Sequence, residues 1–127
     1  MGGSAKEVDN MGYNPYPRRK FGNKKVLVDG MIFDSKKEAR RYLELKMLLQ
    51  AGEISGLECQ KEFELIPRQT DENGKFFEHP VKYIADFVYT DKDGRTVVED
   101  TKGYRTPDYI IKRKLMLKVH GIRVQEI

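Results

Sequence analysis

The sequence has few of the residues that build disulfide-linked or zinc-stabilised proteins. It contains one cysteine, Cys59, two histidines and no tryptophan in 127 residues. A single cysteine excludes an intramolecular disulfide, and it argues against a structural zinc site, which normally has four Cys and His ligands. These absences fit a protein of a reducing compartment, and we expect the cytoplasm.

Long apolar runs are also absent. Hydrophobic residues make up 39% of the chain and charged residues 35%, and no run approaches the roughly 18–20 apolar residues of a transmembrane helix. No signal-peptide pattern opens the sequence. We therefore expect a soluble protein, and the length predicts one folded domain with a modest core.

The positive charge is concentrated near the N-terminus. Residues 1–25 hold six basic residues and two acidic ones, a balance of +4 that equals the net charge of the whole chain. Because this segment is also rich in Gly, Asn and Pro, we expect residues 1–24 to form a flexible basic arm and residues 25–127 the folded domain. The arm is either a solubilising tail or a phosphate-binding segment, whose contacts would come from Arg18, Arg19, Lys20, Lys24 and Lys25.

The pattern of apolar residues and turn signals predicts an α/β fold. A hairpin at residues 26–33, with Asp29 and Gly30 in its turn, precedes a helix over residues 35–51 and a strand over 57–66. Residues 68–80 are polar and predict a loop. Two strands follow at 83–89 and 96–103, then a helix from Thr106 to about residue 119 and a strand over 122–127. This α-β-β-β-α-β order after a hairpin predicts a mixed central sheet flanked by helices.

Two carboxylates and a lysine lie on the two central strands. If residues 92–94 form a three-residue loop with Gly94 in the left-handed region, then Asp86 lies opposite Asp100, and Lys102 shares their face. A loop of two or four residues would instead place Asp86 opposite Thr101 or Glu99. The register of the hairpin therefore decides whether the two aspartates meet.

Opposed carboxylates destabilise a sheet, so folding stability alone does not favour this pair. A bound divalent cation removes the repulsion. The apolar neighbours Ile84 and Val88 predict that Asp86 is partly buried, whereas Glu99 points to the other face and has a structural role. The alternative is a surface salt-bridge ladder of Asp100 with Lys102, which would contribute little stability.

Glu38 lies on the same helical stripe as Tyr42, Leu45 and Leu49, at its N-terminal end. There it could reach the edge of the sheet as a ligand. Ser35 and Glu38 also match a capping box, in which the glutamate bonds back to the Ser35 amide. The spacing favours the cap and leaves the ligand role open.

Further candidates for DNA contacts come from the second helix and the first long strand. Arg105, Lys112 and Arg113 form a basic cluster around the second helix, which is either a solvated face or a lining for DNA. Gln60 is a candidate for hydrogen bonding to a metal-bound water or a phosphate.

These residues resemble the PD-(D/E)XK nuclease superfamily, which includes restriction endonucleases and Holliday junction resolvases. The resemblance rests on residues 33–39, 83–87 and 97–103 and on the element order across residues 24–127. Within the superfamily, the sequence is similar to a family of small phage-encoded proteins. It implies a restriction-endonuclease-like core. Asp86 matches the first acid of the motif, Asp100 the second, Lys102 the lysine and Glu38 the helix glutamate, while Ala85 replaces the proline of the motif name.

The resemblance implies a DNA endonuclease that depends on Mg²⁺ or Mn²⁺. Its cation would be held by Glu38, Asp86, Asp100 and the Thr101 carbonyl, with Lys102 orienting the attacking water or stabilising the transition state. Similarity to resolvases implies branched DNA as a substrate and allows a homodimer. The alternatives are a DNA-binding accessory protein of phage recombination or replication that does not cut, and an enzyme acting on RNA or single strands.

Overall fold

The computed structural model describes residues 24–127, so Arg18, Arg19, Lys20 and most of the predicted arm lie outside the described residues. The described residues divide into two compact units, 24–39 and 40–127. The elements are β1 (Val26–Val28), β2 (Met31–Phe33), α1 (Lys36–Gln50), β3 (Ser55–Ile66), β4 (Gln69–Thr70), β5 (Phe76–Glu78), β6 (Val81–Thr90), β7 (Thr96–Asp100), α2 (Pro107–Leu115), the π-helical turn η1 (Met116–His120) and β8 (Gln125–Glu126).

The first unit contains the predicted hairpin and the start of α1. Strands β1 and β2 pair antiparallel, and Asp29 and Gly30 both have positive φ angles, 52° and 78°, as a type I′ turn requires. At the start of α1, the Ser35 hydroxyl accepts a hydrogen bond from the Glu38 amide at 3.1 Å. Glu38 Oε1 accepts one from the Asp34 amide at 3.2 Å. The predicted cap is therefore present, but its backbone donor is Asp34 and not Ser35.

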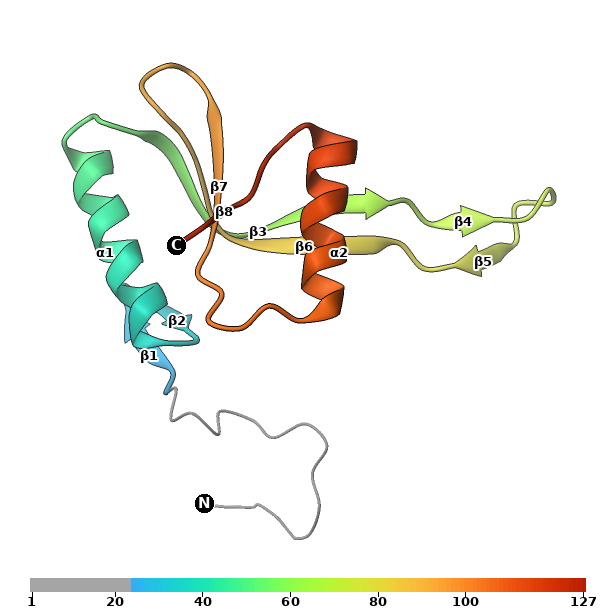
Figure 1. Ribbon diagram of the computed structural model, residues 1–127, viewed down its shortest axis with the longest axis horizontal. Coiled ribbons are helices and arrows are strands. Elements are labelled where there is room, and N and C mark those ends of the chain that lie inside the picture. The colour runs from blue at the N-terminus through green and yellow to red at the C-terminus, as the bar shows by residue number, and fades with distance from the viewer. Residues whose placement is uncertain (1–23) are drawn as a thin grey trace, which may run out of the picture. The chain divides into compact units, whose positions relative to one another are not determined.

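The second unit is built on a four-stranded mixed sheet with the order β3-β6-β7-β8. Strand β6 pairs antiparallel with β3 on one side and with β7 on the other, and β8 pairs parallel with β7. Figure 1 shows the paired strands β3 and β6 running out to the β4–β5 hairpin at one end and bending toward β7 at the other. The α/β class, the mixed sheet and the leading hairpin are as the sequence predicts.

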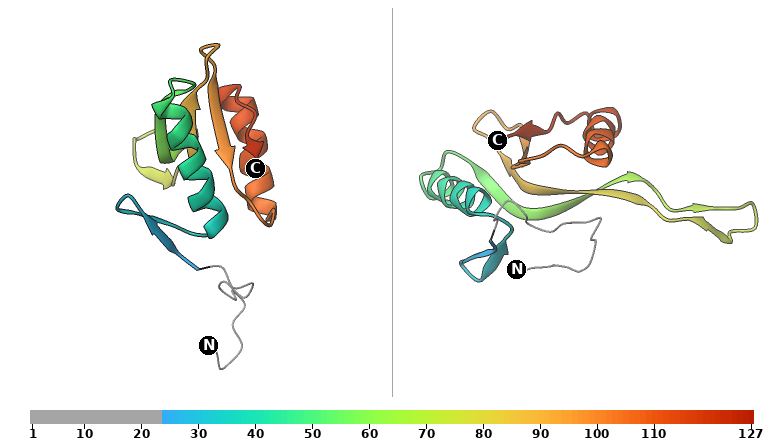
Figure 2. Two further views of the ribbon diagram at one scale, coloured as in Figure 1. Left: turned by 90° about the vertical axis from the view of Figure 1, so that its left-hand side faces the viewer. Right: turned by 60° about the horizontal axis from the view of Figure 1, so that its bottom comes forward.

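The main hydrophobic core lies between this sheet and the helix α2 with η1. The helix begins where the sequence predicts, because Thr106 Oγ1 accepts a hydrogen bond from the Tyr109 amide and Pro107 occupies the first turn. It ends at Gly121, whose φ of 69° places it in the left-handed region. Figure 2 shows α2 beside the sheet. The buried core residues are Leu65, Tyr83, Ala85, Val88, Val98, Tyr109, Met116 and Val124.

The turn between β6 and β7 has the predicted length. The Asp91 amide donates to the Arg95 carbonyl at 2.9 Å, and Gly94 has a φ of 79°. The ladder pairs Thr90 with Thr96, Val88 with Val98 and Phe87 with Glu99. The sequence prediction of a three-residue loop is therefore confirmed, and the register is the one that directs Asp86 toward Asp100.

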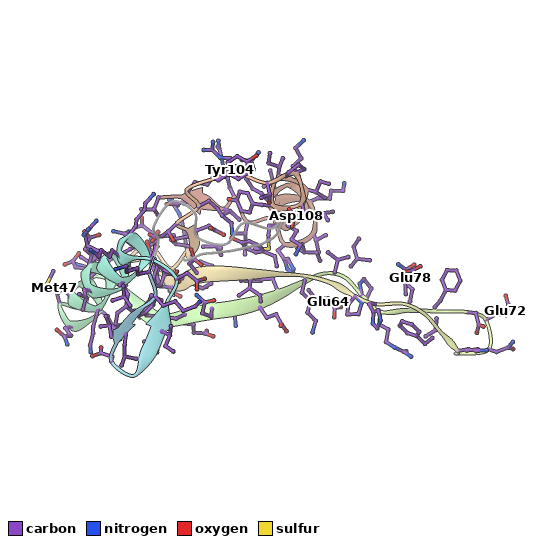
Figure 3. All side chains as sticks on the ribbon, turned by 90° about the horizontal axis from the view of Figure 1, so that it is seen from below. Met47, Glu64, Glu72, Glu78, Tyr104 and Asp108 are labelled. Atoms are coloured by element: carbon purple, nitrogen blue, oxygen red, sulfur yellow. The ribbon has the colours of Figure 1, made fainter. Side chains whose placement is uncertain are left out.

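Four expectations from the sequence are wrong. The strand predicted over 96–103 ends at Asp100, so Lys102 lies beyond it. Residues 68–80 are not a loop, because β4 and β5 form a second hairpin that extends β3 and β6. Figure 3 shows Glu72 at the far end of this hairpin and Glu78 nearer its base. The last strand covers only Gln125–Glu126, and Ile84 is 51% exposed and not buried.

No helix in residues 24–127 has the length and apolarity needed to cross a membrane.

Candidate functional site

Asp100 is the last residue of β7, and its side chain is buried without a full set of partners. Only 1% of its surface is exposed. Its Oδ2 atom accepts a hydrogen bond of 2.6 Å from the hydroxyl of Tyr83, which lies on β6 and is itself buried. Its Oδ1 atom is also buried and has no hydrogen-bond partner in the described part of the chain. One oxygen of this carboxylate is therefore fixed and the other is unsatisfied.

The surroundings of Asp100 disfavour its negative charge. Burial raises the pKa of the Asp100 carboxyl, the Tyr83 hydrogen bond acts in the opposite direction, and the charge of Asp86 raises the pKa again. A buried carboxylate without a cation is costly in free energy. A positive charge placed against Oδ1 would remove most of this cost.

Asp86 lies one residue beyond the end of the β6–β7 ladder, next to the pair Phe87 and Glu99. Because Phe87 pairs with Glu99, the same register places Asp86 opposite Asp100. Asp86 Oδ2 accepts hydrogen bonds of 2.8 Å from both the amide and the hydroxyl of Thr101. Thr101 therefore orients Asp86 at the point where β7 ends. The sequence predicts the meeting of the two aspartates but not this double contact.

Side-chain alternation along β6 is interrupted at Asp86. Ala85 and Val88 both belong to the core beneath α2, although strict alternation would put residues three positions apart on opposite faces. On β3, Gln60 is the residue facing Asp86, because Cys59 pairs with Phe87 and Lys61 with Ala85. Gln60 has a φ of 56° inside a strand, a conformation that costs free energy for a non-glycine residue and often marks a functional site.

Lys102 follows the two aspartates. Its Nζ atom is 3.9 Å from Asp100 Oδ1, and 40% of the side chain is exposed. The same ammonium lies over the ring of Tyr109, 5.2 Å from its centroid. The lysine therefore stands at the solvent side of the buried carboxylate, where it can approach a group that binds Asp100.

Glu99 points to the opposite face of β7, as the sequence predicts. It accepts hydrogen bonds from Arg41 Nε at 2.8 Å and Arg41 Nη2 at 2.6 Å, and from the Tyr89 hydroxyl at 2.5 Å. Arg41 belongs to the part of α1 in the second unit. The charge of Glu99 is therefore fully compensated inside the protein, which is the arrangement of a structural ion pair.

Two of the predicted DNA-binding residues form ion pairs with Glu126. Arg105 contacts Glu126 Oε1 at 2.6 Å and Arg113 contacts Oε2 at 3.0 Å, and the Tyr109 hydroxyl donates to Oε2 at 2.8 Å. These contacts lower the pKa of Glu126 to about 2, with the Arg105 hydrogen bond as the largest cause. Lys112 is half-buried on α2. In the first unit, Lys24 is exposed and Lys25 pairs with Asp34 at 2.8 Å.

Glu38 belongs to the first unit, where it is buried and caps α1. The part of the chain that the structure describes contains no cluster of three or more Asp, Glu, His or Cys side chains suited to a metal ion. The local site is therefore the pair Asp86 and Asp100, with Thr101 and Lys102 beside it.

The residues that sequence reasoning missed are those that surround these acids. Tyr83, Tyr89 and Arg41 each bind a carboxylate on β7. Glu126 forms ion pairs with Arg105 and Arg113. Tyr83 and Tyr89 both lie on β6, and the pairing of β6 with β7 brings them near the two acids of β7. Which acid each tyrosine contacts depends on the interrupted alternation along β6, and this has no signal in the sequence.

Comparison with known proteins identifies the family of the chain. A family described as "Protein of unknown function (DUF1064)" matches residues 18–125. The chain therefore belongs to this family. No curated protein and no solved structure matches the chain.

Proposed function

We propose that this member of the DUF1064 family is a metal-dependent DNA endonuclease with a restriction-endonuclease-like core, whose site is formed by Asp86, Asp100, Thr101 and Lys102. The observation that carries the proposal is the unsatisfied Oδ1 of Asp100, a buried carboxylate oxygen beside a second carboxylate. A protein gains no stability from such a group. It is explained if the oxygen is a ligand.

The residues present fit a hard divalent cation such as Mg²⁺ or Mn²⁺. Mg²⁺ is commonly held by one or two carboxylates, with water and substrate phosphate oxygens completing its coordination. Asp86 and Asp100 supply two carboxylates, which is the number that this pattern needs. When bound, the cation would lower the pKa of a water molecule and neutralise charge on the phosphate.

Each side chain has a role that follows from its position. Tyr83 holds Oδ2 of Asp100 in place, while Oδ1 keeps no hydrogen-bond partner among the described residues. Thr101 fixes Asp86 through two hydrogen bonds. Lys102 is close enough to Asp100 to place its ammonium against a phosphate oxygen, where it stabilises the negative charge that develops as the phosphodiester is attacked.

A cleavage assay tests the proposal. Supercoiled plasmid and a synthetic four-way DNA junction are incubated with the protein in Mg²⁺, Mn²⁺ or EDTA. We expect cutting only with a divalent cation, and its loss in Asp86→Asn and Lys102→Ala. The matched control is Lys92→Ala, because Lys92 is an exposed lysine that pairs with Glu53 on the surface. Faster cutting of the junction than of the plasmid would identify branched DNA as the substrate.

Two outcomes contradict the proposal. If the wild type never cuts any substrate with either cation, the chain is not this endonuclease, and DNA binding without cutting would favour an accessory protein. If Asp86→Asn and Lys102→Ala cut as fast as Lys92→Ala, then the site lies elsewhere.

The ligand role of Glu38 rests on the resemblance and is separable from its cap. Glu38→Gln keeps an oxygen that can accept the Asp34 amide but removes the charge, whereas Glu38→Ala removes both. If Glu38 binds the cation, Glu38→Gln loses cleavage while its unfolding midpoint in urea stays near that of the wild type. If Glu38 only caps α1, Glu38→Gln cuts normally and Glu38→Ala alone is destabilised, by about 1 kcal/mol.

A further inference from the structure

A cavity of about 650 Å³ lies between α2 with η1 and the segment that contains β8. The helix side contributes two cations and an apolar residue, and the β8 side contributes a third cation, an amide, an acid and a buried valine. The lining residues are Arg113, Lys114, Leu117, Arg123, Val124, Gln125 and Glu126. None of these residues belongs to the site proposed above.

The cavity is positively charged although the domain as a whole is balanced. Residues 26–127 carry 18 basic and 18 acidic residues, yet three cations and one carboxylate line this cavity. Glu126 is already engaged by Arg105 and Arg113. Lys114 and Arg123 are exposed, and neither forms an ion pair within residues 24–127. Two uncompensated cations therefore face the same hollow.

The cavity adjoins the proposed catalytic carboxylate. In the parallel ladder of β7 and β8, Asp100 is the partner of Glu126, which lines the cavity. The Ile127 amide also donates to the Asp100 carbonyl at 2.9 Å. Adjacent strands in a sheet are about 4.8 Å apart. A ligand in the cavity therefore lies beside β8, the strand next to the one that carries Asp100.

We propose that this cavity binds a backbone phosphate of a DNA strand, next to the phosphate held at Asp86 and Asp100. Lys114 and Arg123 supply the charge, the Gln125 amide can donate a hydrogen bond, and Arg113 is shared with Glu126. Phosphate contacts of this kind fix the register of the strand without reading its sequence. The inference rests on the proposed function, because it assigns the flanking phosphate of the same substrate.

Equilibrium binding to DNA tests this assignment. The full chain is titrated into a labelled duplex of about 20 base pairs in EDTA, which prevents cutting, over a series of salt concentrations. The variant is Lys114→Gln with Arg123→Gln. The control is Lys75→Gln with Arg95→Gln, which removes the same charge from two exposed side chains outside the cavity. We expect at least tenfold weaker binding for the cavity variant, and a plot of log K against log salt that is shallower by about 2.

The inference is overturned if the wild type and the cavity variant bind DNA equally well. It is also overturned if the cavity variant and the control variant lose the same amount of DNA affinity. To separate this from failure of the proposed function, a thymidine dinucleotide with a 5′ phosphate is titrated into the protein in EDTA and followed by NMR. Shifts at the amides of Lys114, Arg123 and Gln125 support the cavity even if the protein never cuts DNA. If the wild type cuts DNA but shows no such shifts, the nuclease proposal stands and the phosphate-binding role of the cavity is wrong.

Discussion

Glu99 and Asp100 are neighbours on β7 and are equally buried, yet only Glu99 is hydrogen-bonded to a cation. Glu99 is bound by the guanidinium of Arg41 and the hydroxyl of Tyr89. Asp100 has one tyrosine hydroxyl, a second carboxylate nearby and a lysine at 3.9 Å. Each acid thus receives a tyrosine from β6, but only Glu99 receives a close cation.

The difference indicates that Glu99 stabilises the fold, whereas Asp100 is suited to binding a cation. A compensated buried carboxylate gives an ion pair that is costly to break. An uncompensated one lowers stability until a ligand arrives, which is a common property of functional sites. The comparison predicts that charge removal at the two positions will have opposite consequences.

Asp100→Asn is expected to have the largest effect on cleavage. Removing the charge that holds the cation should slow cutting by roughly 10³-fold or more. The free energy of unfolding without metal should be equal to or higher than that of the wild type, because the asparagine oxygen can still accept the Tyr83 bond while the buried charge is gone. Plasmid cleavage and urea unfolding measure the two quantities. A large loss of stability would show that Asp100 is structural.

Glu99→Gln should produce the reverse result. The substitution leaves Arg41, 22% exposed at its side chain, beside an uncharged partner, and we expect unfolding to become easier by roughly 2–4 kcal/mol. Affinity for Mn²⁺, measured by calorimetry below the unfolding temperature, should be unchanged. If Glu99→Gln is as stable as the wild type, the contrast between the two acids does not hold.

The two tyrosines allow a matched comparison. Tyr83→Phe frees Oδ2 of Asp100, whereas Tyr89→Phe removes the same hydroxyl from Glu99. Both variants should lose about 1–2 kcal/mol of stability. Only Tyr83→Phe should weaken Mn²⁺ binding, by roughly 10-fold, because loss of a group that orients a ligand typically costs this much. Equal metal affinities in the two variants would show that Tyr83 does not position Asp100.

The smallest effect is a dependence of stability on alkaline pH. Burial, followed by the Glu99 hydrogen bond, raises the pKa of Tyr89 from 10.0 to about 12. The protonated hydroxyl therefore stabilises the folded state fully below pH 10, and this contribution is lost as the pH rises to about 12. In urea unfolding, the advantage of the wild type over Tyr89→Phe should shrink across this interval. An advantage that stays constant would mean that Tyr89 does not titrate differently in the folded protein.

The register of the site is the part that the sequence predicts best. Gly94 and the residues before it specify a three-residue turn, and counting from this turn places Asp86 opposite Asp100 and sends Glu99 to the other face. The start of α2 is equally clear, because Thr106 and Pro107 are local signals. Such features depend on a few neighbouring residues, so the sequence contains all the information that they need.

Features that depend on distant residues could not be predicted. Arg41 and Glu99 are 58 positions apart, and nothing local indicates that they meet. The β4–β5 hairpin was missed because its strands are short and its residues are polar, although Asn73 and Gly74 lie at its turn. The interrupted alternation along β6 changes which residues face α2, and strict alternation gave Ile84 the wrong environment.

The turn between β6 and β7 has a consequence for how this protein can evolve. Its residues from Lys92 to Arg95 are exposed, so their side chains can be exchanged with little effect on packing. Its length cannot change in the same way. A deletion or insertion of one residue that was absorbed by the pairing would turn Glu99 toward the site and Asp100 toward Arg41. We therefore expect this surface turn to tolerate substitutions freely and to reject changes in length.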